Sequence, residues 1–258
     1  MGRADGLHQC RPDRRRPARR TRAGPRRRRA DSGPWPAGRT WTSAPGDALL
    51  CSVLVRPPLT WIDPHVVTSA LALAATDAVR EHAGVELGVK WPNDLVAGRT
   101  SRIDDRKVAG ILAESVAQGG RVAAVVGGIG LNLATPDVAV AAGSTPPVGV
   151  VELATDATSD TPPVDPVHLA VTMVRGLERW LSTVDRSGRS PRIAAAVTRR
   201  SATLGRRVRV ERGAVGATLF GDAVGIEEDG RLLVAREDGV VEAIAVGDVV
   251  HLHPDDQR

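Results

Sequence analysis

The feature that most constrains the fold of this chain is a pair of apolar segments that contain glycines and are joined by a short turn. The first segment reads KVAGILAE at Lys107–Glu114 and is predicted to be a strand. A hairpin turn with two adjacent glycines is predicted at Gln118–Arg121. The chain then returns as the antiparallel partner over Val122–Val126 and continues into GGIGLN at Gly127–Asn132. Glycines on such strands let a ligand approach the backbone closely.

A third segment, KWPNDL at Lys90–Leu95, ends a predicted strand in a turn. Its proline, asparagine and aspartate favour that turn, which brings Lys90, Asn93 and Asp94 together at the strand end. The chain has 33 arginines but only two lysines, Lys90 and Lys107, and both lie in these segments. An ammonium group on a flexible stem suits a single carboxylate or phosphate oxygen, whereas a guanidinium group binds as a fork. The two lysines are therefore candidate anion contacts.

The spacing of apolar residues predicts the elements that surround these segments. Ala48–Arg56 is expected to be a strand of the core sheet, in which Cys51 is a buried small apolar residue. A helix is expected to begin at Asp63-Pro64, an N-cap followed by proline, and to end at Gly84. This helix should cover one face of the sheet. Ser101–Arg106 is polar and is expected to be a mobile connection.

The second half of the chain is expected to support the first and to end in a small β domain. Thr135–Pro163 is predicted to be mainly loop, and helices are predicted to begin at Asp165-Pro166 and Ser190-Pro191. From Leu204 onward, short valine-rich strands alternate with Asp-Gly turns, which are strong hairpin signals. The predicted strands are Val208–Val210, Ala217–Ile226, Leu232–Ala235, Val240–Ala245 and Val249–Leu252. This pattern predicts a small β-barrel.

Composition excludes several classes of protein. The apolar fraction of 42% and the charged fraction of 25% are those of an ordinary soluble globular protein. No apolar run reaches the length of a membrane span, and two cysteines suggest neither a disulfide framework nor zinc. The arginine-rich start lacks the apolar region of a secretory signal, so a cytoplasmic location is expected.

Together, the three segments resemble the core of the biotin protein ligases, in their spacing as well as their letters. The resemblance implies an α+β fold, with a class II synthetase-like mixed sheet flanked by helices and followed by a small SH3-like β-barrel. The catalytic domain would span residues 37–200 and the C-terminal domain residues 201–258.

The resemblance also implies the chemistry. ATP would activate biotin to biotinyl-5′-AMP with release of pyrophosphate, with Mg²⁺ as the metal. Biotin would then pass to a lysine of the biotin carboxyl carrier domain of an acyl-CoA carboxylase. Positioning and charge neutralisation would carry the first step, because a carboxylate and a triphosphate repel each other. No membrane partner is implied, and nucleic acid is not an expected partner.

Residue roles follow from the same resemblance. Lys107 would lie between the biotin carboxylate and the α-phosphate, and Lys107 and Arg39 would be the catalytic residues. The biotin contacts would be Lys107, Gly110, Ile111, Gly128, Ile129 and Gly130. The nucleotide contacts would be Arg39, Trp41, Lys90, Asn93, Asp94 and Asn132. Asp94 would contact Mg²⁺, since a carboxylate beside phosphates makes physical sense only with a metal between them.

Residues 1–36 depart from the family. They carry a net charge of +9, so the rest of the chain carries −4, and their Arg- and Pro-rich composition cannot bury a core. The family's Ser-Thr-Asn and Gln-Thr-Ala-Gly-Arg-Gly-Arg motifs are absent from this segment. A one-base shift in permissible codons for Gly6–Pro12 and Ala30–Pro36 restores both motifs in order. We therefore expect residues 1–36 to be an out-of-frame translation that impairs the ligase.

Three alternatives stay open at the level of the sequence. A lipoate-ligase relative would share the fold, although the C-terminal barrel and the KWPND string argue against it. The basic residues 1–36 could form a disordered arm that binds nucleic acid through phosphate contacts. An inactive remnant of a ligase is the third alternative.

Overall fold

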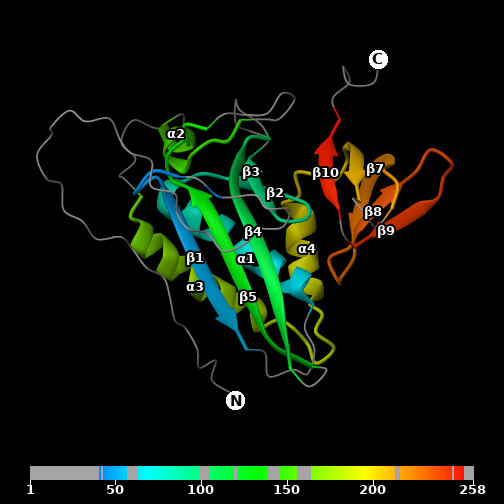
Figure 1. Cartoon of the computed structure of the whole chain (residues 1–258), viewed down its shortest axis with the longest axis horizontal. Coiled ribbons are helices and arrows are strands. Elements are labelled where there is room, and N and C mark those ends of the chain that lie inside the picture. The colour runs from blue at the N-terminus through cyan, green and yellow to red at the C-terminus, as the bar shows by residue number, and fades with distance from the viewer. Residues whose placement is uncertain are drawn as a thin grey trace, which may run out of the picture.

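The computed structural model describes residues 41, 43–56, 63–98, 105–118, 121–138, 146–155, 164–212, 216–245 and 247–252. Within these residues the chain forms two five-stranded sheets and four helices (Figure 1). The first sheet lies in the N-terminal part of the described chain and the second in the C-terminal part, as the sequence predicted. Residues 1–36, which are the segment expected to be out of frame, lie outside the described residues.

The first sheet has the strand order β1-β5-β4-β3-β2. Each pair of named neighbours is antiparallel, and the parallel element is an isolated bridge between Val89 and Ser201. The predicted hairpin is confirmed as β4–β5, in which the glycine run belongs to the strand as far as Asn132. The strands are β1 (Ala48–Val55), β2 (Leu87–Lys90), β3 (Asp94–Ala97), β4 (Lys107–Gln118) and β5 (Arg121–Asn132).

The helices begin where the sequence places their caps. The Asp63 carboxylate accepts from the His65 amide at the start of α1 (Pro64–Ala83), and Gly84 ends that helix in the left-handed conformation. Asp165 caps α3 and Ser190 caps α4 in the same way. The other helices are α2 (Val150–Thr155), α3 (Pro166–Leu181) and α4 (Pro191–Arg199). The prediction that Thr135–Pro163 is mainly loop missed α2, which has only six residues.

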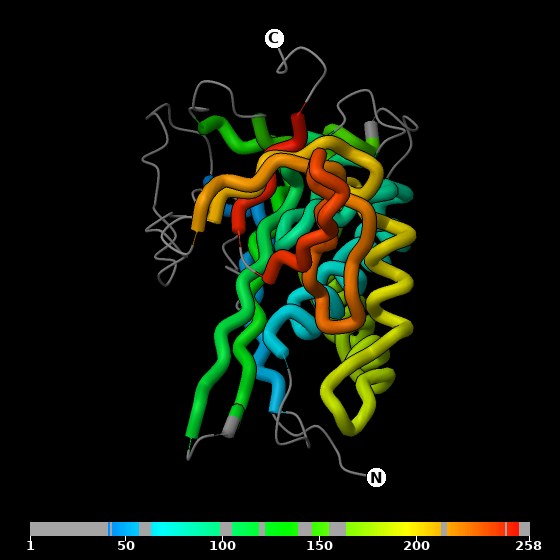
Figure 2. The backbone as a smooth tube through the Cα atoms, turned by 90° about the vertical axis from the view of Figure 1, so that its right-hand side faces the viewer, coloured from blue at the N-terminus to red at the C-terminus, as the bar shows by residue number. Residues whose placement is uncertain are grey.

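The core lies between the first sheet and its helices. Helix α1 has apolar residues on nearly all sides. This suits its position, since the sheet covers one side of the helix and α3 and α4 cover the other. At Gly176 of α3 the two helices approach closely, since a Cβ atom there would lie 3.2 Å from that of Ala74. Figure 2 shows α1, α3 and α4 on the same side of the sheet, and α2 packs against α1 in the same core. The other face therefore carries no helix of the described chain.

The second sheet has the order β10-β6-β7-β8-β9, with every pair antiparallel. It confirms the predicted small β domain, although no pairing of β9 with β10 closes a barrel within the described strands. Its strands are β6 (Arg207–Glu211), β7 (Leu219–Ile226), β8 (Leu232–Ala235), β9 (Val241–Ile244) and β10 (Asp248–His251). None of the described helices is long and apolar enough to cross a membrane.

The two domains meet at the edge strand β2. The Val89 amide donates to the Arg200 carbonyl (2.8 Å), and the Ala202 amide donates to the Val89 carbonyl (2.9 Å). Trp91, which follows β2, is 5% exposed and packs in the apolar core of the second sheet rather than the first. Its indole Nε1 donates to the Gly230 carbonyl (2.8 Å). The KWPND turn is therefore also the joint between the domains.

Candidate functional site

The helix-free face of the first sheet has a floor of glycines. Gly110 of β4 lies directly opposite Gly130 of β5, and Gly128 lies opposite Leu112 on the same face. Side chains alternate along a strand, so Gly127 points to the other face. A Cβ atom at Gly127 would contact Leu71 of α1 at 3.4 Å. We call Gly110, Gly128 and Gly130 the glycine floor.

The indole of Trp41 covers part of this floor. A Cβ atom built on Gly130 would lie 2.8 Å from the Trp41 ring, and one built on Gly110 would lie 3.4 Å from it. No side chain larger than hydrogen fits at Gly130 while the indole holds this position. Glycine at 130 thus lets a flat aromatic ring lie against the backbone, which the sequence alone did not indicate.

The Lys107 amine lies beside the same floor. Its Nζ and Cε atoms are each 3.2 Å from the position of a Cβ atom on Gly110. Nζ pairs with a carboxylate oxygen of Asp94 at 2.6 Å, and the Lys107 side chain is 41% exposed. Because Asp94 lies opposite Gly110 on the neighbouring strand β3, the ion pair holds the ammonium over the glycines. The exposed fraction leaves the ammonium accessible to an anion.

Two asparagines support the backbone around Lys107. The side-chain Nδ2 of Asn93 donates to the Ile111 carbonyl (2.8 Å), and the backbone amide of Ile111 donates to the Asn93 carbonyl (2.8 Å). Asn132 is 3% exposed, and its Nδ2 lies 3.4 Å from the carbonyls of both Lys107 and Val148. In this structure both amides bond to the chain itself, so the nucleotide contacts expected of them stay predictions.

The structure brings together most of the predicted site residues, but not all of their side chains. Ile111 and Ile129 are buried in the core on the helix-covered face. Their side chains point away from the glycine floor, so only their backbone atoms face it. Lys90 lies at the end of β2, at the domain joint, where its charge acts on Asp105 and His251. Arg39 lies outside the described residues.

The acidic side chains of the described residues do not form a metal site by themselves. In the described part of the chain, no group of three or more His, Cys, Asp or Glu side chains could hold a metal ion. Asp94 is a single carboxylate and is already paired with Lys107. Mg²⁺ often takes only one or two protein carboxylates together with substrate phosphates. This arrangement therefore fits a Mg²⁺ ion that arrives with a nucleotide, not one held by the protein alone.

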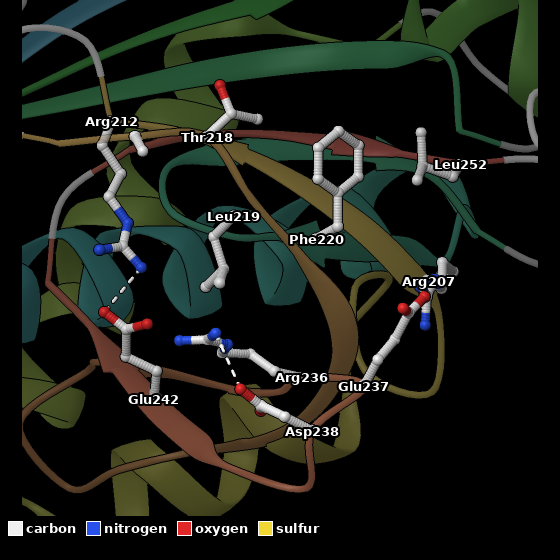
Figure 3. Close-up of a pocket in the computed structure, with 11 residues that line it drawn as sticks. Arg207, Arg212, Thr218, Leu219, Phe220, Arg236, Glu237, Asp238, Glu242 and Leu252 are labelled. Carbon is white, nitrogen blue, oxygen red and sulfur yellow. Dashed lines mark hydrogen bonds and ion pairs between the residues drawn. The ribbon is translucent and has the colours of Figure 1, made fainter.

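A separate cavity of about 940 Å³ lies in the C-terminal domain, lined by residues of that domain (Figure 3). Phe220 is half exposed at this cavity. Its arginines are paired with carboxylates: Arg236 with Asp238 (2.8 Å), Arg212 with Glu242 (2.7 Å), and Arg207 with Glu237. Each arginine of the cavity is therefore neutralised by a carboxylate of the same cavity. None of the predicted site residues lines it. We place the site at the glycine floor.

The segment before Lys107 was expected to be mobile, but its described end is fixed. Asp105 bonds to residues of the C-terminal domain, and Arg106 Nε donates to the Pro146 carbonyl (3.0 Å). The Val148 amide donates to the Lys107 carbonyl (2.9 Å). The sequence does not indicate these supports, because they join segments about 40 to more than 140 residues apart. The only local signal was the charged string DDRK at positions 104–107.

Comparisons with known proteins agree with this geometry. Residues 28–132 match the family model "Biotin/lipoate A/B protein ligase family", and residues 203–252 match "Biotin protein ligase C terminal domain". The chain is 34% identical over 201 residues to the biotin–[acetyl-CoA-carboxylase] ligase of Paracoccus denitrificans, covering 76% of this chain and 77% of that protein. It is 33% identical over 222 residues to the corresponding ligase of Mycobacterium tuberculosis, covering 83% and 73%.

Solved structures are similar in fold. A biotin protein ligase from Aquifex aeolicus, solved in complex with biotin and ATP, matches with a TM-score of 0.63 and 19% identity. The match covers 83% of this chain and 82% of that one. A biotin protein ligase from Leishmania major, in complex with biotinyl-5-AMP, matches with a TM-score of 0.53 and 22% identity, covering 84% and 86%. At these identities the matches establish the fold.

Proposed function

Since this chain belongs to the biotin protein ligase family, we propose that its glycine floor and Lys107 activate biotin with ATP for transfer to a protein. The observation that carries the proposal is the Lys107 amine, held by Asp94 over Gly110, where Gly110, Gly128 and Gly130 expose the backbone of the sheet. Glycines leave room for a flat ligand against the backbone. The ammonium supplies the charge that two anionic reactants need.

The proposed reaction has two steps. A carboxylate oxygen of biotin attacks the α-phosphorus of ATP, a P–O bond forms, and the bond to pyrophosphate breaks. A carrier lysine amine then attacks the acyl carbon, an amide forms, and AMP leaves. Lys107 offsets the repulsion between carboxylate and phosphate in the first step, and charge placed in advance costs no reorganisation. Trp41 covers one side of the floor and excludes water there.

The cofactor and the partner belong to the same proposal. Mg²⁺ would enter with ATP as part of the substrate and neutralise phosphate charge, with Asp94 the candidate carboxylate beside it. The acceptor would be the biotin carboxyl carrier domain of an acyl-CoA carboxylase, as the names of the relatives suggest. The match of residues 203–252 to the C-terminal domain of biotin ligases favours biotin over lipoate. The expected cytoplasmic location stays a prediction.

Gly128 offers a direct test of the floor as the biotin site. A Cβ atom there would meet nothing closer than the Leu112 carbonyl at 3.8 Å, so the protein tolerates a methyl group. We expect Gly128→Ala to keep the unfolding temperature of the parent but to weaken biotin binding about tenfold, which corresponds to ~1.4 kcal/mol. Titration calorimetry with biotin and thermal unfolding measure the two effects.

Gly127→Ala is the matched control for this test. It adds the same methyl group one residue earlier, on the face covered by α1, at ordinary contact distance from Leu71. We expect it to leave biotin affinity unchanged. Equal losses of affinity in the two variants would contradict the assignment of biotin to the glycine floor.

The predicted impairment of the chain as printed is tested separately. We expect weak or absent pyrophosphate release with biotin and ATP, because residues 1–36 lack the two motifs that would complete the ligand shell. A version with those residues translated in the alternative frame should recover turnover. Turnover by the printed chain at about 1 s⁻¹ or faster, an ordinary enzyme rate, would contradict this prediction. A gene sequence with an intact frame through codons 1–40 would instead contradict the interpretation of residues 1–36 as an out-of-frame translation.

A further inference from the structure

A buried polar network joins the two domains just before Lys107. The Asp105 carboxylate pairs with Arg206 and accepts from His251 Nδ1 (3.3 Å). On the other side of the ring, His251 Nε2 lies 3.2 Å from the Thr203 hydroxyl. The Thr203 oxygen also accepts from the Trp91 amide (3.0 Å). The network therefore runs from the catalytic domain into the C-terminal domain and back.

The members of this network are well shielded from water. The side chain of Asp105 is 12% exposed and that of His251 is 5% exposed. A buried carboxylate is costly unless it is paired and hydrogen-bonded, and Arg206 together with His251 meets that need. Breaking the network would therefore leave a buried charge without its partners.

The protonation of the network is consistent with this geometry. Burial lowers the pKa of the His251 imidazole, and the Asp105 carboxylate opposes this only in part, so His251 is neutral at pH 7. Burial raises the pKa of the Asp105 carboxyl, but the hydrogen bond from His251 and nearby positive charges outweigh it and hold that pKa below its usual value. A neutral ring that donates a hydrogen bond from Nδ1 accepts one from the Thr203 hydroxyl at Nε2.

Asp105 also has an unusual backbone. Its φ of 64° makes it the one residue other than glycine with a positive φ among the described residues. Aspartate tolerates this conformation better than most residues, but holding it costs on the order of 1 kcal/mol or more. Such a conformation persists when the surroundings fix it. Here the fixing contacts come from the C-terminal domain.

The fixed residue lies two positions before the first residue of β4. Asp105 is followed by Arg106, which bonds to the Pro146 and Pro147 carbonyls, and then by Lys107 at the first position of β4. We propose that Asp105, Arg206 and His251 are positioning residues that set the Lys107 amine over the glycine floor, so that the C-terminal domain completes the catalytic site. The relevance to catalysis rests on the proposed function, whereas the effect on Lys107 does not.

The lysine content of the chain provides the test. Only Lys90 and Lys107 are present, so a chain labelled with ¹³C at lysine Cε gives two ε-methylene signals, and Lys90→Arg identifies them. Lys107 Cε and the Trp41 ring both contact the Cβ position of Gly110. The Lys107 signal should therefore be displaced by the ring current of the indole.

We expect Asp105→Asn, Arg206→Ala and His251→Gln each to remove the larger part of that displacement. Arg207→Ala is the matched control, because it removes the same charge one residue along, where the partners are Asp222 and Glu237. It should leave the Lys107 signal in place. If Arg206→Ala fails to fold, Asp105→Asn still tests whether the network positions Lys107, because asparagine has nearly the same shape as aspartate. A Lys107 signal unchanged in Asp105→Asn and His251→Gln overturns the proposal.

A double-mutant cycle between Asp105 and Lys107, followed by kinetics, tests whether this positioning matters for catalysis. In a parent that forms the adenylate, Asp105→Asn should lower kcat about tenfold with the biotin KM within about twofold, because small misplacement of a catalytic group is costly. The same change should have no further effect in a Lys107→Ala background, since residues that act through one group are not additive. Additive losses overturn the positioning role. Absence of adenylation in the version with the alternative reading frame counts against the proposed function, while the NMR comparison still decides whether the network positions Lys107.

Discussion

Replacing Lys107 by alanine is expected to lower the rate of biotinyl-adenylate formation at least ~100-fold, by analogy with the removal of one preorganised donor to a developing charge. The change removes the ammonium that Asp94 holds 2.6 Å away over Gly110. It also leaves the Asp94 carboxylate facing two further anions. Pyrophosphate release under saturating biotin and ATP measures the effect. If the printed chain proves too slow, the version with the alternative reading frame serves as the parent.

Further variants and a stability measurement show whether the loss of rate comes from the lost charge, from the shape of the cation or from unfolding. Lys107→Arg keeps the positive charge but replaces a compact ammonium by a planar fork, so we expect only partial activity. Because Lys107 is 41% exposed and exposed ion pairs contribute about 0–1 kcal/mol, thermal unfolding should change little in either variant. Lys90→Ala removes the other lysine and should cost less, since Lys90 lies at the domain joint. A near-normal rate in Lys107→Ala would remove this residue from the proposed role.

Replacing Trp91 by alanine is expected to destabilise the protein by ~3–5 kcal/mol, the usual cost of removing a buried large aromatic side chain. Trp91 is 5% exposed in the core of the second sheet, while its backbone belongs to the KWPND turn of the first. The substitution thus opens a cavity at the contact that anchors one domain to the other. Since typical stabilities are ~5–15 kcal/mol, the loss should be plain in urea unfolding followed by circular dichroism.

Two other substitutions calibrate this result. Trp91→Phe keeps most of the apolar ring but removes the hydrogen bond to the Gly230 carbonyl, so we expect a loss nearer ~1 kcal/mol. Trp180→Ala removes a partly buried tryptophan on α3, away from the joint, and should cost less than Trp91→Ala. If Trp91→Ala were no more destabilising than Trp180→Ala, Trp91 would not be the anchor described here.

Much of the fold was predictable because its signals are local. Asp63, Asp165 and Ser190 cap helices where the sequence placed them, since a cap bonds to amides two or three residues away. The β4–β5 hairpin and the five short strands of the C-terminal domain follow from alternation and turn residues. Helix α2 was missed because six residues give too little periodic signal.

The candidate site was predictable in part. Lys107, Asp94 and the glycines were expected together, and the structure joins them. The side chains of Ile111 and Ile129 lie in the core instead, because residues next to a floor glycine point to the other face of the strand. Asp105 was assigned to a mobile connection, since nothing near it in the sequence announces Arg206 or His251, more than 100 residues away.

The sequence by itself determined the family, the order of the elements and the identity of the two lysines. These depend on residue types and short spacings. Only the tertiary structure decided that Trp91 anchors the second sheet, that Trp41 lies on the glycine floor and that Asp105 is held by the C-terminal domain. Each of these contacts joins segments distant along the chain. They exist because packing and buried charge must be satisfied in three dimensions, which no local pattern records.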